Sequence, residues 1–185
     1  MARNDIGLRF IWAAIWQGLL AALVTAILFA YGSIYFKPAP AMVIASGSAG
    51  TWMFIGYITY IVMVIAIGVT GLLYEFIEAR FRGSITGIPA MLANAHLVLM
   101  NIGVIGATWL LMYAGYRGGT ALLPASSGGL GLTTLQAHEQ ILSVYPTYIV
   151  IFIIATIIGM LCGGAAFVLS MHRKGSQEKA NPRVR

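Results

Sequence analysis

The chain has 185 residues, of which 59% are hydrophobic and only 9% are charged, whereas soluble domains average about 25% charged residues. So little charge cannot cover the surface of a soluble protein, which excludes an ordinary soluble globular domain. The formal net charge of +6 does not indicate nucleic-acid binding, because the basic residues gather at the ends of apolar runs instead of forming one basic patch.

The first apolar run covers residues 10–32, and its main polar residues are Gln17 and Thr25. A membrane-spanning helix needs about 20 mostly apolar residues, and this run meets that length. A cleaved signal peptide has a shorter apolar core of about 7–15 residues. The run therefore predicts a retained transmembrane helix.

The second run predicts a helix over residues 52–77, and Tyr74 at the end of its apolar part is typical of an interface anchor. We expect Glu75 and Glu78 to extend this helix beyond the bilayer. Glu78 and Arg82 are four residues apart in the order that favours an ion pair. The pattern favours a solvated, salt-paired helix end, although paired carboxylates also occur in metal and proton sites.

The third run predicts a helix over residues 88–113 and contains the stretch LANAHLVLMN. Because successive helical residues rotate by about 100°, Asn94 and Asn101 share a face and His96 points roughly the other way. A helix surrounded by lipid does not tolerate polar side chains on two faces. At least one face must therefore contact protein, cofactor or water.

Several roles remain open for His96. Its imidazole can hydrogen-bond Gln17, which lies at a similar depth on the first helix, and this is a purely structural role. It can also ligate a haem iron, belong to a proton path or solute cavity, or contribute to a copper or quinone site.

The fourth run predicts a helix over residues 134–171. Thr133 and Gln136 fit a capping box, which indicates that this helix starts at residue 134. Pro146 lies about three turns further on and predicts a kink. The segment before the kink carries His138 and Glu139 near the outer surface, where they are weak candidates for a metal or substrate site.

Small residues on two of the predicted helices indicate close helix packing. A four-residue spacing of this kind lets two helix backbones approach closely in lipid, either within the chain or against another subunit. These residues are Ala155, Gly159 and Gly163 on the fourth helix, and Gly103 and Gly106 on the third.

The basic residues predict the topology of the four helices. Nine lie on the side of both chain ends (Arg3, Arg9, Arg80, Arg82, Arg173, Lys174, Lys179, Arg183 and Arg185), and Lys37 and Arg117 lie on the other side. By the positive-inside rule both termini are cytoplasmic. We therefore expect an all-α, integral membrane, four-helix up-down bundle in the plasma membrane. It forms a single domain over residues 1–185, and a basic cytoplasmic tail, residues 172–185, contacts anionic lipids.

Residues 92–115, LANAHLVLMNIGVIGATWLLMYAG, resemble the second helix of haem–copper oxidase catalytic subunits. In that family an Ala-His pair followed by a methionine carries a ligand of the low-spin haem. The resemblance implies haem b as a cofactor and His96 as its ligand. This chain has four apolar runs against twelve helices in the family, and it has no His-x-His pair. The oxygen-reducing chemistry is therefore not implied.

A haem bound by this chain alone needs a second axial ligand at the depth of His96. His138 and His172 lie at the two membrane boundaries, so the second ligand would be Met63, Met100 or a residue of another chain. Together these observations predict an accessory subunit of an electron-transfer or oxidase-type membrane complex, held by other membrane subunits and without catalytic activity of its own. The alternative is a small homo-oligomeric channel or transporter component.

Overall fold

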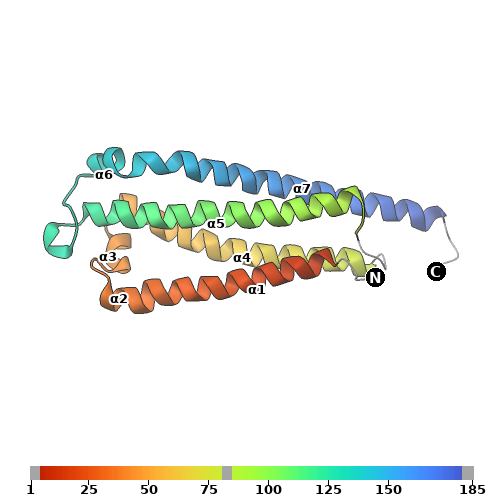
Figure 1. Cartoon of the computed structure of the whole chain (residues 1–185), viewed down its shortest axis with the longest axis horizontal. Helices are drawn as coiled ribbons and strands as arrows, with labels where there is room; N and C mark the ends of the chain where they lie inside the picture. The colour runs from red at the N-terminus through yellow and green to blue at the C-terminus, as the bar shows by residue number, and fades with distance from the viewer. Residues whose placement is uncertain (1–4, 81–84, 181–185) are drawn as a thin grey trace. The chain divides into compact units, whose positions relative to one another are not determined.

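The computed structural model describes residues 5–80 and 85–180, and their side chains up to His172. All regular structure in these ranges is helical (Figure 1). The long helices are α1 (Ile6–Thr25), α4 (Ser48–Arg80), α5 (Ile88–Leu122) and α7 (Tyr145–Ala180). The short elements are η1 (Ala26–Tyr31), α2 (Gly32–Tyr35), α3 (Pro40–Ala45), η2 (Ala125–Ser127), α6 (Thr134–Gln140) and η3 (Leu142–Val144).

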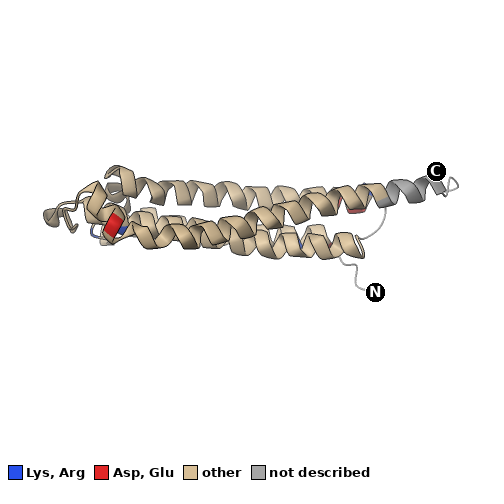
Figure 2. Ribbon diagram, turned by 90° about the horizontal axis from the view of Figure 1, so that it is seen from above, with Lys and Arg blue, Asp and Glu red and all other residues tan. Residues whose placement is uncertain are grey.

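Four helical segments in the described part of the chain are long and apolar enough to cross a membrane. They match the four predicted runs. The first three are longer than predicted, because α1 continues through η1 and α2 to Tyr35, α4 covers Ser48–Arg80 and α5 continues to Leu122, whereas the fourth starts later, at Leu142. Figure 2 shows these helices without Lys, Arg, Asp or Glu along most of their length. Backbone groups in lipid must be satisfied within the segment, which is why such uncharged runs form helices. The spans are Ile6–Tyr35, Ser48–Arg80, Ile88–Leu122 and Leu142–His172.

The predicted capping box at Thr133 is confirmed. The Thr133 hydroxyl accepts from the Gln136 backbone N–H at 3.3 Å, and the Gln136 side chain accepts from the Thr133 backbone N–H at 2.9 Å. The predicted kink at Pro146 is wrong, because α6 ends at Gln140 and α7 starts separately at Tyr145. Pro146 is thus in the first turn of α7, where its missing N–H leaves no hydrogen bond unmade.

The chain packs as two compact units, and each contains part of every long helix. Unit 1 comprises residues 1–16, 65–102 and 155–185, and unit 2 comprises residues 17–64 and 103–154. The residues outside the described ranges all belong to unit 1, so unit 2 is described throughout.

In unit 1 the helices pack as antiparallel pairs. Gly7 of α1 lies against Glu75 of α4, while Gly71 of α4 lies against Ile11 of α1. The contact partners run in opposite directions along the two helices, which defines the antiparallel arrangement. The α5–α7 pair is also antiparallel, because Gly159 of α7 meets Met100 of α5 while Gly163 meets His96.

In unit 2 glycines bring α4 and α5 together. A Cβ added to Gly56 would lie 2.7 Å from the Thr108 carbonyl oxygen, and one added to Gly115 would overlap the Met53 backbone. These pairs also run in opposite directions, as expected for consecutive helices of an up-down arrangement. A hydrogen bond of 2.8 Å between the hydroxyls of Thr25 and Tyr57 joins α1 to α4.

The end of α4 differs from the solvated end that the sequence predicts. Glu78 is fully buried, and its Oε1 accepts from the Ile85 backbone N–H at 3.2 Å. The carboxylate thus fixes the start of the segment that leads into α5. Its predicted partner Arg82 lies outside the described residues, so the ion pair stays a prediction.

Candidate functional site

His96 lies inside a cluster of aromatic side chains in unit 1. Its ring is only 5% exposed, and its Nδ1 lies 3.3 Å from the hydroxyl oxygen of Tyr74 on α4. The ring of Phe10 on α1 is centred 5.0 Å from the imidazole. His96 therefore meets protein on its buried face, one of the alternatives that the sequence left open.

The α7 helix closes the cluster. Phe167 stacks on Tyr74 with ring centroids 4.3 Å apart, and a Cβ added to Gly163 would overlap the His96 ring. The cluster thus joins one residue or more from each of the four long helices. Tyr74 is fully buried, so the prediction that it anchors the membrane interface is wrong; α4 continues past it and α1 covers it.

The side-chain N–H groups of the two amides near His96 donate to backbone carbonyls one turn back on the same helix. Asn94 Nδ2 donates to the Ala90 carbonyl at 2.9 Å, and Asn101 Nδ2 donates to the Leu97 carbonyl at 2.7 Å. The Asn94 Oδ1 accepts from an Arg9 guanidinium N–H at 2.9 Å. These contacts place both amides in structural roles, because a side chain that bonds the carbonyl one turn back needs no external ligand.

Gln17 belongs to unit 2 and is 5% exposed. Its backbone carbonyl accepts from the Tyr60 hydroxyl at 3.3 Å. The sequence proposed Gln17 as the partner of His96. The partner that the structure gives for Nδ1 is Tyr74 instead.

The surroundings of His96 do not fit a haem. A porphyrin needs a wide slot beside the ligand ring, and here Phe10, Tyr74 and the backbone at Gly163 contact that ring. Met100, one of the proposed second ligands, is itself buried against α7. In this arrangement His96 packs the helices together.

The second candidate, His138 with Glu139, lies on α6 with both side chains exposed. Among the described residues no group of three His, Cys, Asp or Glu side chains could hold a metal ion. A stable site for a transition metal needs several converging ligands. The pair alone therefore does not form a metal centre.

The small residues predicted to pack helices are found at contacts within the chain. On α7, Gly159 faces the Met100 backbone and Gly163 faces His96, while Ala155 on the same helix is half-buried. On α5, Gly106 lies against the Phe152 ring of α7 and Gly103 is buried. The spacing thus serves α5–α7 packing inside each unit.

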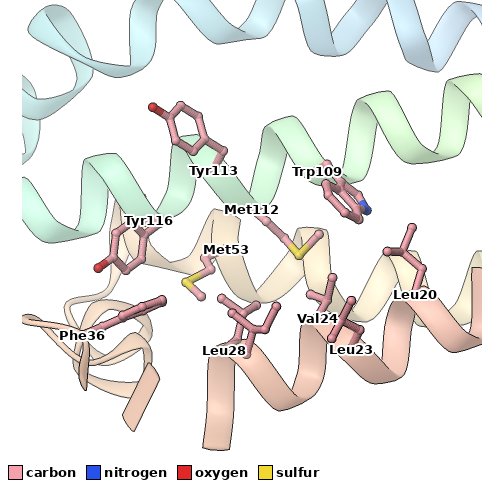
Figure 3. A pocket seen from close by; sticks show the side chains of 11 residues that line it. Leu20, Leu23, Val24, Leu28, Phe36, Met53, Trp109, Met112, Tyr113 and Tyr116 are labelled. Atoms are coloured by element: carbon pink, nitrogen blue, oxygen red, sulfur yellow. The ribbon is translucent and has the colours of Figure 1, made fainter. Parts of the chain in front are cut away.

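Unit 2 also contains an apolar pocket with a volume of about 370 Å³. Residues between Leu20 and Leu28 on α1 and η1 form one wall, and residues between Trp109 and Tyr116 on α5 form another. Phe36 and Met53 complete the lining (Figure 3). The volume lies within the range of about 300–1,000 Å³ that is usual for small-molecule sites.

Sequence reasoning missed this pocket because its lining has no distinctive residue type. The wall residues come from separate helices and are almost entirely apolar. Taken alone, each wall segment has the composition of an ordinary lipid-facing or buried helix.

Comparison with protein-family models, with curated proteins and with solved structures gave no match for this chain.

Proposed function

We propose that this chain is a multi-pass subunit of the plasma membrane whose main role is to assemble with other membrane subunits. Four spans of sufficient length and apolarity support membrane insertion. The distribution of charge supports the orientation. The sequence ranges of unit 1 contain nine of the eleven basic residues, and those of unit 2 contain only Lys37 and Arg117. Both termini would then be cytoplasmic.

The observation that carries the assembly role is the exposed face of α1. Only 11% of the apolar window in the first span is buried, against 39% in the span of α5. On this face Gly18, Ala22 and Ala26 follow one another at four-residue spacing; both alanines are exposed, and a Cβ added to Gly18 would meet nothing within 4 Å. This spacing lets another helix approach closely in lipid. Gly159 and Gly163 of α7, by contrast, lie against α5.

The resemblance of residues 92–115 to haem–copper oxidase catalytic subunits supports the kind of complex that we propose. We place the chain in an electron-transfer complex as an accessory subunit. The packing of His96 favours a structural role over haem ligation for this residue. Cofactors of such a complex would then be held by the partner subunits.

The test is to extract an affinity-tagged chain from its native membrane in digitonin and to separate it on a native gel. We expect a band much larger than the 19.8 kDa chain, with a reduced-minus-oxidised haem spectrum in the large band. Ala22→Leu and Ala26→Leu should release most of the chain to the position of the free protein. Ala165→Leu, at an exposed alanine of α7, is the matched control and should leave the large band intact.

Two outcomes would overturn the proposal. If the wild-type chain migrates only as a homo-oligomer, and the purified protein passes ions across liposome membranes, the chain is a channel component. If the large band lacks any haem spectrum and Ala22→Leu leaves it unchanged, neither the electron-transfer complex nor the α1 docking face is supported.

A further inference from the structure

The apolar pocket of unit 2 ends beside two cations. Phe36 lines the pocket, and the next residue along the chain is Lys37. Tyr113 also lines the pocket, and its hydroxyl accepts from the guanidinium of Arg117 at 3.3 Å. Both cationic side chains are exposed.

One hydrogen bond ties these two cations to the same end of the pocket. The hydroxyl of Tyr116, another lining residue, donates to the Pro38 carbonyl at 3.3 Å. Arg117 is the residue after Tyr116, and Lys37 is the residue before Pro38. Each cation is therefore adjacent in sequence to one of the two residues that form this hydrogen bond.

The charge of unit 2 is concentrated at these positions. Along residues 17–64 and 103–154, all of which the structure describes, Lys37 and Arg117 are the basic residues and Glu139 is the acidic one. Arg117 uses one Nη to bond Tyr113, and a guanidinium carries five N–H donors. The remaining donors can bind an anion beside Tyr113, which lines the pocket.

The shape and chemistry of the pocket suit a hydrocarbon chain. The wall on α1 and η1 runs from Leu20 to Leu28, which is about 12 Å of helix at 1.5 Å per residue. The Tyr116 hydroxyl is engaged with Pro38 and the Tyr113 hydroxyl with Arg117. The lining thus offers almost no polar group to a ligand that needs hydrogen bonds deep inside, such as a quinone ring.

We propose that the pocket of unit 2 binds one acyl chain of an anionic phospholipid whose head group lies against Arg117 and Lys37. The apolar walls hold the chain and the two cations select the head group. A polybasic surface gains about 1 kcal/mol for each Lys or Arg near an anionic lipid, which corresponds to about a fivefold preference per cation. The proposal needs membrane insertion but neither a partner subunit nor a haem, so it can fail or hold independently of the assembly role.

The experiment is native mass spectrometry of the full chain in mild detergent, titrated with dioleoyl phosphatidylglycerol or with dioleoyl phosphatidylcholine. The two lipids have the same chains and differ in head-group charge. We expect one phosphatidylglycerol molecule to bind with a Kd at least about fivefold below that for phosphatidylcholine. Arg117→Gln and Lys37→Gln should each reduce the preference for phosphatidylglycerol about fivefold.

The chain-binding half of the proposal is tested by filling the pocket. Val24 is half-buried in the pocket wall, and Val24→Phe should weaken the binding of both lipids. Leu28→Phe is a second variant for the case in which Val24→Phe does not give a monodisperse protein. Val62→Phe makes the same change at a position 55% exposed outside the pocket, and it should leave both affinities unchanged.

Three results would overturn the proposal. Equal affinities for the two lipids would show that Arg117 and Lys37 do not select the head group. Unchanged binding in well-folded Val24→Phe and Leu28→Phe proteins would show that the chain binds elsewhere. A quinone recovered from the purified protein and recognised by its ultraviolet spectrum, with release by Val24→Phe, would give the pocket a different ligand.

Discussion

The hydroxyl oxygen of Tyr74 lies 3.3 Å from Nδ1 of His96, and both side chains are buried among residues of four helices. Buried polar groups in a membrane protein usually find partners, because an unmade hydrogen bond in a low-dielectric surrounding is costly. This pair therefore explains why a helix otherwise suited to lipid tolerates an imidazole.

Tyr74→Phe removes the hydroxyl while keeping the ring that stacks on Phe167. We expect a loss of about 1 kcal/mol in the free energy of unfolding, since interhelical hydrogen bonds in membrane proteins contribute on average about 0.6 and at most about 1.7 kcal/mol. Thermal unfolding of the purified protein in detergent measures the change. Tyr148→Phe, at a residue 58% exposed on α7, should have no effect, and an equal loss in both variants would contradict the role of the buried pair.

The positions of the helices could be predicted from the sequence because each depends on a local property. Long uncharged runs must form helices in lipid, and the Thr133–Gln136 capping box depends on two residues three apart. The partner of His96 could not be predicted in the same way. Tyr74 and His96 are 22 residues apart. Both pack against Phe10 of α1, and Tyr74 also stacks on Phe167 of α7, which are contacts that no local sequence pattern predicts.

The burial of Glu78 and the pocket of unit 2 could not be predicted from the local sequence either. Glu78 looked like half of an exposed ion pair, and it is buried because residue 85 returns against α4 and donates its N–H to the carboxylate. The pocket forms where the apolar walls of separate helices leave space, and a volume between helices has no signature in any one segment. Tertiary contacts decide both features.

Thr133→Ala tests the start of α6. Loss of a capping side chain costs about 0.5–2 kcal/mol, so α6 should open more often while the long helices stay intact. Amide hydrogen exchange over residues 134–140 measures this opening and should rise well above the wild-type rate. Thr134→Ala changes the neighbouring threonine, which does not cap the helix, and should leave exchange nearly unchanged; similar exchange in both variants would argue against the cap.

Gly71 and Gly68 on α4 form a matched pair against α1. A Cβ added to Gly71 would lie 3.0 Å from the Ile11 backbone nitrogen, whereas one added to Gly68 would lie 3.5 Å from the Ala14 Cβ, an ordinary contact. Gly71→Ala should destabilise the protein by about 1–3 kcal/mol, as overpacking usually does. Gly68→Ala should be neutral or slightly stabilising, because alanine is the better helix former. Thermal unfolding of the two variants side by side checks the difference, and equal stability would contradict the close α1–α4 contact.

Gly163 and Gly164 on α7 test the packing around His96 in the same way. A Cβ added to Gly163 would overlap the imidazole, and a Cβ added to Gly164 would meet nothing within 4 Å. Gly163→Ala must therefore push α7 away from α5 or turn the His96 ring away from Tyr74, and a cost of about 1–3 kcal/mol is expected. Gly164→Ala changes the adjacent residue of the same helix and should not lower stability.

The two outcomes at Gly163 also bear on the choice between structural and haem roles for His96. If the ring only packs the helices, Gly163→Ala lowers the unfolding temperature and leaves the visible spectrum of the native complex unchanged. If His96 holds a haem, the same substitution alters the haem spectrum, since it moves the ligand ring. Recording both the unfolding temperature and the reduced-minus-oxidised spectrum of Gly163→Ala and Gly164→Ala therefore separates the two roles in one pair of variants.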